Sequence, residues 1–183
     1  MRSFFKTAIV LCAICAVAAV VLALVNKVTF PEIQKYEESV VLGALEEVSA
    51  GYKIGLKADV SDNEYVSYYY DLKENGNIKG YLLGLKTKGY GGDMTLVASY
   101  DIKGVLLSAK LVSDSETPGL GKKAENPAYM NKYIGRGSEE SPIPVSKNML
   151  SSADSAAVSG ASMTFNGISR ALAAGSDYVK GVK

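Results

Sequence analysis

Three hydroxyl side chains lie within six residues near the C-terminus, in the segment Ser159-Gly160-Ala161-Ser162-Met163-Thr164. Its small residues let a bulky group approach the backbone closely. Apolar residues then recur at helical spacing, which predicts a helix from Phe165 onward; they are Ile168, Ala171, Leu172, Gly175 and Val179. Because the first turn of a helix has unpaired N–H groups and a positive dipole end, an anion held there would be stabilised. The simpler alternative is an ordinary Ser/Thr helix cap.

Two glycine-rich loops precede this segment. In residues 87–93 (TKGYGGD), the glycines would let the backbone pass close to a bound ring, and Tyr90 could stack on it; the alternative is a plain turn. The second loop runs Glu116-Thr117-Pro118-Gly119-Leu120-Gly121 and is followed by Lys122 and Lys123. Its match to a dinucleotide-binding pattern is weak, since hairpin strands rather than a βαβ unit surround it.

Several chemistries are excluded by composition. The chain of 183 residues contains no histidine, which removes Ser-His-Asp and Cys-His nucleophile systems and histidine-based zinc sites. Of the 20 basic residues, Arg2 and Lys6 precede the apolar run. The other 18 lie beyond residue 25, together with all 19 acidic residues, so the charges there nearly balance. No basic stripe indicates a nucleic-acid partner. We expect neither catalytic side chains nor a metal site.

An uncharged apolar run of 19 residues, Thr7 to Val25, is long enough to cross a bilayer as a helix. Arg2 and Lys6 precede it and predict a cytoplasmic N-terminus and an exported C-terminal part. A signal peptide is the main alternative, but its apolar region is usually shorter. Cys12 and Cys15, the only cysteines, lie inside this run, which favours packing within the membrane over a cluster shared with a partner protein.

The remaining pattern predicts an α+β domain. Thr29-Phe30-Pro31-Glu32 has the residues of a helix start, and this helix should reach Gly51 with an apolar stripe that faces the domain or a partner. Four strands should follow as an antiparallel meander, over residues 65–72, 78–86, 94–101 and 105–112, with the first hairpin turning at Asn75-Gly76. Residues 125–134 suggest a short helix, and residues 135–148 a polar loop.

These features occur in a distinctive order: membrane anchor, GYGG loop, strand pair, S-E-T-P-G-L-G, and S-G-A-S-x-T before a helix. The chain thereby resembles, over nearly its whole length, the FMN-binding family of the G subunit of the Rnf electron-transport complex. The C subunit of the sodium-pumping NADH:quinone reductase is a close relative of that family. The most distinctive string is Glu116–Gly121.

The resemblance implies a covalent FMN whose phosphate is esterified to the last residue of an [ST]-G-A-T motif by a flavin transferase. Carried over to Ser159-Gly160-Ala161-Ser162, it makes Ser162 the acceptor, with Thr164 as the fallback. The family usually has Thr at the acceptor and Asp six residues earlier, where this chain has Ala156; the nearest acid is Asp154. The residues expected around the flavin are Ser159, Gly160, Ala161, Ser162, Thr164, Glu116, Thr117, Pro118, Gly119, Leu120, Gly121 and Tyr90.

The expected organisation is a cytoplasmic N-terminus (residues 1–6), a transmembrane helix (7–25), a linker helix (26–51) and an extracytoplasmic FMN-binding domain (52–183). The resemblance implies a subunit that relays electrons among membrane partners in a ferredoxin:NAD⁺ oxidoreductase pumping Na⁺ or H⁺, in the lipid of the cell membrane. The alternatives are an anchored extracytoplasmic flavoprotein reductase, a component like the C subunit of the NADH:quinone reductase, and a non-catalytic interaction module.

Overall fold

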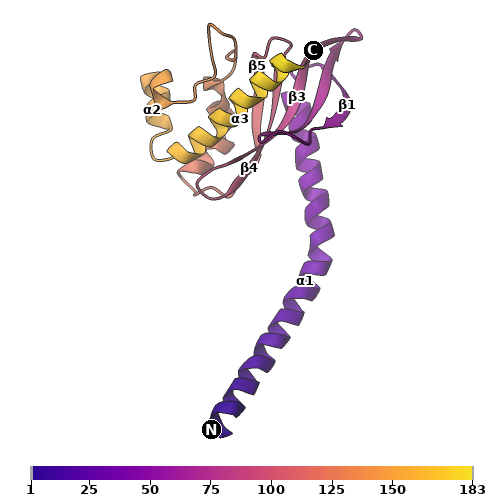
Figure 1. Ribbon diagram of the computed structural model, residues 1–183, viewed down its shortest axis with the longest axis vertical. Helices are drawn as coiled ribbons and strands as arrows, with labels where there is room; N and C mark the ends of the chain where they lie inside the picture. Colours follow the sequence, from indigo (N-terminus) through magenta and orange to yellow (C-terminus); the bar gives the residue numbers. More distant parts are fainter. Residues whose placement is uncertain (1, 183) are drawn as a thin grey trace. The chain divides into compact units, whose positions relative to one another are not determined.

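The structure is a computed structural model that describes residues 2–182, apart from the side chains of Arg2, Ser3 and Glu37 (Figure 1). Contacts divide the chain into two units, Met1–Val40 and Val41–Lys183. Helix α1 (Arg2–Val48) belongs to both, and the two parts of it are described separately.

The part of α1 in the first unit has an exposed surface. Its described side chains from residue 4 to residue 39 are all exposed, including the apolar ones of the run 7–25. Within the described residues, α1 alone is long and apolar enough to cross a membrane. A helix satisfies its own backbone hydrogen bonds, so apolar side chains on all its faces are compatible with lipid.

The helix start predicted at Thr29 is wrong, because α1 continues through this point with Pro31 in its interior. The Thr29 hydroxyl donates a hydrogen bond to the Val25 carbonyl oxygen (2.9 Å), four residues back, as Thr does inside a helix. Pro31 removes one N–H donor from the ladder, yet the helix persists on both sides of it. Thr29 and Pro31, which are residue types favoured in the first turn of a helix, therefore lie in the interior of α1.

The second unit is built on a five-stranded antiparallel sheet in sequence order, which confirms the α+β expectation. Four of its strands are the predicted meander, within a few residues at each end. The strands are β1 (Lys53–Asp59), β2 (Val66–Glu74), β3 (Asn77–Lys88), β4 (Asp93–Asp101) and β5 (Leu106–Ser113).

The β2–β3 hairpin turns at Asn75 and Gly76, as predicted. Both residues have positive φ (51° and 83°), as a two-residue turn between Glu74 and Asn77 requires. Strand β1 was not predicted from the sequence. It is an edge strand with a register shift between Ile54 and Lys57, and its largely exposed side chains lack the alternation of a half-buried strand.

Each face of the sheet has its own apolar core. On one face the last turns of α1 bury Ala44, Leu45 and Val48 against Leu72, Leu82 and Val97. Of the predicted stripe of α1, Ala44 and Val48 are buried here, whereas Ile33 and Tyr36 are exposed. Successive strand residues point to opposite faces, so the neighbours of Leu82 and Val97 face the other core.

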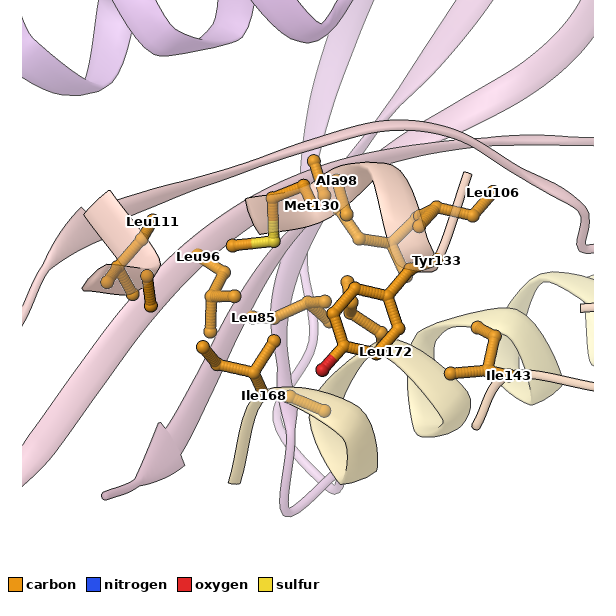
Figure 2. Close-up of a cluster of buried hydrophobic side chains, with 14 of the residues drawn as sticks. Leu85, Leu96, Ala98, Leu106, Leu111, Met130, Tyr133, Ile143, Ile168 and Leu172 are labelled. Atoms are coloured by element: carbon orange, nitrogen blue, oxygen red, sulfur yellow. The ribbon is translucent and has the colours of Figure 1, made fainter. Parts of the chain in front are cut away.

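Helix α3 (Ser162–Gly181) lies across that other face of the sheet (Figures 1 and 2). Its predicted apolar face is confirmed: the residues from Ile168 to Val179 contribute to a core with Leu83, Leu85, Leu96, Ala98 and Tyr133. The Tyr100 hydroxyl donates to the Leu172 carbonyl oxygen (2.9 Å), which ties the helix to β4. This packing fixes where the first turn of α3 lies.

Short helical turns fill the connection from β5 to α3. The predicted helix in residues 125–134 corresponds to a 3₁₀ turn, η2 (Pro127–Lys132), and another such turn that was not predicted, η1 (Gly121–Glu125), precedes it. A further turn, η3 (Lys147–Met149), and a short helix, α2 (Ser152–Ala157), were not predicted. In α2 the N-cap is Ser151, whose hydroxyl accepts the Asp154 N–H and donates to the Asp154 carboxylate, so Asp154 is the partner of the cap.

Candidate functional site

The two glycine-rich loops and the start of α3 converge on one cavity of about 380 Å³. All three stretches singled out in the sequence contribute to its wall, although they are far apart in the chain, from Tyr90 to Thr164. The lining residues are Tyr90 from the loop between β3 and β4, Glu116, Thr117, Leu120 and Gly121 from the second loop, and Gly160, Ala161 and Thr164 from the start of α3.

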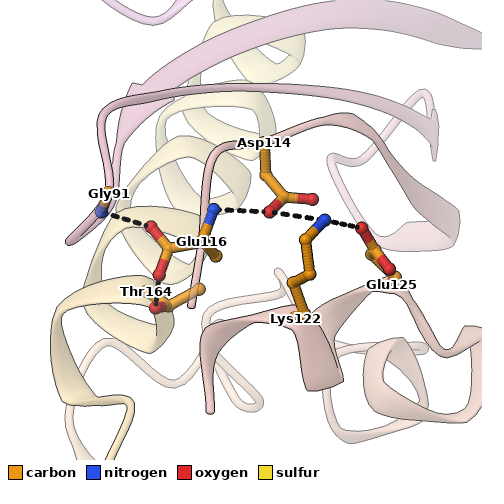
Figure 3. A network of polar contacts seen from close by, with 6 residues as sticks. All are labelled: Gly91, Asp114, Glu116, Lys122, Glu125 and Thr164. Carbon is orange, nitrogen blue, oxygen red and sulfur yellow. Dashed lines mark hydrogen bonds and ion pairs between the residues drawn. The ribbon is translucent and has the colours of Figure 1, made fainter. Parts of the chain in front are cut away.

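The Glu116 carboxylate joins these three stretches (Figure 3). Its Oε1 accepts the Gly91 N–H (3.0 Å), and its Oε2 accepts the Thr164 hydroxyl (2.5 Å). The Glu116 N–H donates to Asp114 Oδ1 (2.8 Å), which holds the carboxylate at the bend after β5. Glu116 is 4% exposed and Thr164 1%, so the network is internal. Nothing in the sequence distinguished Glu116 from an exposed acidic residue in a loop.

The glycines of the GYGG loop are needed by the protein's own packing. A Cβ on Gly89 would lie 2.1 Å from Glu116 Oε1, and one on Gly91 would lie 1.9 Å from the Ser115 carbonyl oxygen. The close approach predicted at this loop is therefore made by the second loop. Tyr90 is 77% exposed at the rim of the cavity, where its ring is free to contact a ligand.

The first turn of α3 presents two hydroxyls in different surroundings. Ser162 is the first residue of the helix and is exposed, and its hydroxyl has no hydrogen-bond partner among the described residues. The residue before it, Ala161, occupies the cap position and forms no side-chain cap bond. The N–H groups in the first turn of α3 therefore donate to no side-chain cap. Thr164, in contrast, is buried and bonded to Glu116.

Other residues expected at the site lie beside the cavity or away from it. Ser159, Pro118, Gly119 and Ser162 are absent from its wall, although each neighbours a lining residue in the chain. The Ser159 hydroxyl donates to the Ser155 carbonyl oxygen (3.0 Å). Gly119 adopts a positive φ of 78° with open space at its Cβ position, so this glycine serves the turn.

The two lysines after the second loop are not positioned to neutralise an anion in the cavity. Lys122 pairs with Glu125 (2.5 Å) and Asp114 (3.6 Å), and neither lysine lines the cavity. The hydrogen bond to Glu125, ahead of the charge of Asp114, raises the pKa of Lys122 above its ordinary value. The remaining candidates for anion binding at this site are the N–H groups of α3.

A larger cavity of about 620 Å³ flanks α3 between the helix and the ends of β3 and β4, and no sequence pattern indicated it. Met163, next to Ser162 in the chain, contributes to its wall. Its charged lining residues carry both signs: Lys86, Lys88, Arg170, Glu64 and Asp93.

A family model for the FMN-binding domain matches residues 89–176. This range starts at the GYGG loop and ends within α3, so it contains all three stretches that meet at the cavity. Residues 89–176 are thus similar to the FMN-binding domain family. The cofactor expected from the resemblance is thereby confirmed as FMN.

Similar proteins share one name, that of the G subunit of an ion-translocating complex. The chain is 29% identical over 154 residues to the G subunit of the Na⁺-translocating ferredoxin:NAD⁺ oxidoreductase complex of Acetobacterium woodii, covering 77% of this chain and 74% of the relative. It is 26% identical over 187 residues to the G subunit of the ion-translocating oxidoreductase complex of Methanosarcina acetivorans, covering 97% and 95%. A proton-translocating counterpart from Clostridium ljungdahlii is 23% identical over 104 residues, covering 57% and 55%. The resemblance to the G subunit is confirmed.

The cavity of the FMN-binding domain fits a flavin. Its volume of about 380 Å³ lies within the range of about 300–1,000 Å³ typical of small-molecule sites. Tyr90 and Leu120 give it apolar surface for a ring system, while the free N–H groups of α3 suit a phosphate. Tyr90 and Leu120 would hold the ring, and the start of α3 would hold the phosphate.

Proposed function

We propose that this chain is the FMN-carrying electron-transfer subunit of a membrane-bound, ion-translocating ferredoxin:NAD⁺ oxidoreductase complex. The FMN-binding domain and the names of the similar proteins support this function. The structural observation that carries it is the convergence of the GYGG loop, the Glu116–Gly121 loop and the start of α3 on one cavity. The relatives include subunits of sodium-translocating and of proton-translocating complexes, so the proposed function covers Na⁺ and H⁺ as coupling ions.

The FMN is attached through its phosphate to the Ser162 hydroxyl. Three observations support Ser162 over Thr164: its exposure, its lack of a hydrogen-bond partner among the described residues, and its position at the first residue of α3. Thr164 is 1% exposed and its hydroxyl is bonded to Glu116, so a flavin transferase could not reach it without opening the site.

The bound flavin supplies the electron chemistry, and the protein supplies position and electrostatics. A phosphodiester retains one negative charge, and the unpaired N–H groups of the first turn of α3 stabilise it. Tyr90 and Leu120 line the cavity from the two glycine-rich loops and would contact the ring. A covalent tether keeps the flavin on the protein in both redox states, which suits a relay outside the cytoplasm.

The chain is a single-pass membrane protein with residues 7–25 across the bilayer and residues 52–183 outside the cytoplasm. Support comes from the apolar helix and from the positive charges that precede it in the sequence. Its partners are the membrane lipid, the other membrane subunits of the complex, and the flavin transferase that attaches FMN.

Affinity purification from the native membrane tests this function. A tagged chain should co-purify with polytopic membrane subunits and carry a yellow chromophore that chemical reduction bleaches. A yellow chain that purifies alone in mild detergent would indicate a stand-alone flavoprotein reductase. A colourless chain made in the presence of its transferase would contradict any flavin function.

A further inference from the structure

The Glu116 carboxylate is an acid enclosed within the protein. The residue is 4% exposed, and both carboxylate oxygens accept hydrogen bonds, one from the Gly91 N–H and one from the Thr164 hydroxyl. A carboxylate accepts through both of its oxygens, and each oxygen of Glu116 faces a donor. The site is thus built to hold a negative charge.

Two glycines leave the space that this carboxylate occupies. A Cβ on Gly121 would lie 2.1 Å from Glu116 Oε2, and a Cβ on Gly89 would lie 2.1 Å from Glu116 Oε1. Real Cβ atoms essentially never approach so closely, so a larger residue at either position would have to displace the carboxylate. Residues from two separate loops therefore position this one side chain.

Within the described residues, no cation balances this charge. Gly91 and Thr164 are neutral donors, and in the described part of the chain no Lys or Arg side chain forms an ion pair with Glu116. Figure 3 shows that the nearby Lys122 is directed to Asp114 and Glu125 instead. Glu116 thus adds an uncompensated negative charge to the wall of the cavity.

We propose that Glu116 is a tuning residue that lowers the reduction potential of the flavin. The proposal rests on the proposed function, since it requires the flavin in this cavity. Reduction adds negative charge to the ring or requires a proton to offset it. A fixed carboxylate makes that added charge less favourable, and the effect is strong where protein excludes water. The bonds to Gly91 and Thr164 keep the carboxylate at the wall.

Substitution Glu116→Gln removes the charge while retaining both hydrogen bonds. The Gln carbonyl oxygen can accept the Gly91 N–H. The Thr164 hydroxyl, which is both donor and acceptor, can turn to accept from the Gln amide. The matched control is Thr164→Val, which keeps the charge and the side-chain shape but removes one donor.

Spectroelectrochemical titration of the full chain with covalent FMN measures the effect. Glu116→Gln should raise the midpoint potential, and Thr164→Val should lower it or leave it unchanged. The rise should persist at high salt, because a buried charge is poorly screened. An effect on packing alone would not confine the rise in potential to the substitution that removes the charge.

An unchanged or lower potential in Glu116→Gln, with FMN still attached, would overturn the proposal. If Glu116→Gln does not fold, the proposal is tested by Thr164→Val instead. A rise in the midpoint potential of the flavin in Thr164→Val would also overturn the proposal. Failure of the proposed function has a different signature, since the wild-type chain would then carry no flavin at all.

Discussion

At the scale of single residues, burial separates the two hydroxyls of the α3 start. Ser162 and Thr164 are two residues apart, yet one is exposed without a partner among the described residues and the other closes a buried network with Glu116. The resemblance to the family makes Ser162 the acceptor and Thr164 the fallback, but the sequence does not show how their surroundings differ. Their different surroundings come from the second loop, which is 40 or more residues away in the chain.

The two hydroxyls should differ in their contribution to stability. Thr164→Ala leaves Glu116 Oε2 without its donor and should lower the free energy of unfolding by about 1–3 kcal/mol. Ser162→Ala removes an exposed hydroxyl that is not the helix cap and should change it by less than about 0.5 kcal/mol. Urea unfolding of the flavin-free protein measures both values. Equal values for the two variants would contradict the buried network.

Lys132 gives the domain a pH dependence. The residue is 9% exposed, its Nζ lies 3.2 Å from the centroid of the Tyr129 ring, and burial lowers its pKa to about 8. Because the folded-state pKa lies below the ordinary 10.5, the folded state disfavours the charged form, and this cost is fully present below pH 8. The cost disappears as pH rises from 8 to 10.5.

Comparison with Lys132→Met isolates this contribution. The free energy of unfolding of the wild type should rise relative to the variant by about 1–3 kcal/mol between pH 8 and pH 10.5, since one pKa unit corresponds to ~1.4 kcal/mol. Burial raises the pKa of Tyr129 to about 12, above this window. A difference that stays constant with pH would show that Lys132 is not desolvated.

At the scale of elements, the site depends on close contact between two loops and a helix. Helix α3 is held near the end of β3, where the Thr87 hydroxyl donates to the Gly167 carbonyl oxygen (3.1 Å). The Leu120 Cδ2 atom lies 3.2 Å from the Cβ position of Gly160. These contacts bring three stretches of chain to one cavity without a contiguous motif.

Two glycines of the second loop should respond differently to a methyl group. Gly121→Ala would force its Cβ against Glu116 Oε2 (2.1 Å) and Thr164 Oγ1 (2.8 Å), so it should cost about 1–3 kcal/mol and alter the flavin spectrum. Gly119→Ala has open space but keeps a positive φ, so it should cost about 1–2 kcal/mol and leave the spectrum unchanged. Absorbance and unfolding measurements check both. A spectrum altered by Gly119→Ala alone would reverse this assignment.

Elements with strong local patterns could be predicted from the sequence, whereas those that depend on tertiary contact could not. The Asn75-Gly76 hairpin and the apolar face of α3 are encoded locally, and both are confirmed. Strand β1 has largely exposed side chains without alternation, and helix α2 has six residues, too few for a periodic signal. The buried role of Glu116 could not be predicted, because it depends on glycines in two loops.

At the scale of the whole molecule, two units meet the two requirements of the proposed function. One contains the apolar helical run, with exposed side chains at the described positions from residue 4 to residue 39, and the other contains residues 89–176, which match the model of the FMN-binding domain. The start of α3 and both glycine-rich loops belong to the second unit, so the cavity is complete within it.

The orientation of the anchor gives a testable consequence. With Arg2 and Lys6 before the apolar run, the N-terminus should stay in the cytoplasm and the C-terminus should be outside. Protease added to intact protoplasts should digest a C-terminal tag on the full chain while a cytoplasmic marker survives. A tag that is protected until lysis would contradict this topology.

The site of flavin attachment tests the proposed function most directly. The full chain should be co-expressed with its native flavin transferase, its intact mass measured, and the protein then digested for peptide mapping. We expect one FMN per chain, bound to Ser162 through a phosphoester. Ser162→Thr should retain the adduct and Ser162→Ala should lose it. An adduct on Thr164, or no adduct on the wild-type chain, would contradict the assignment.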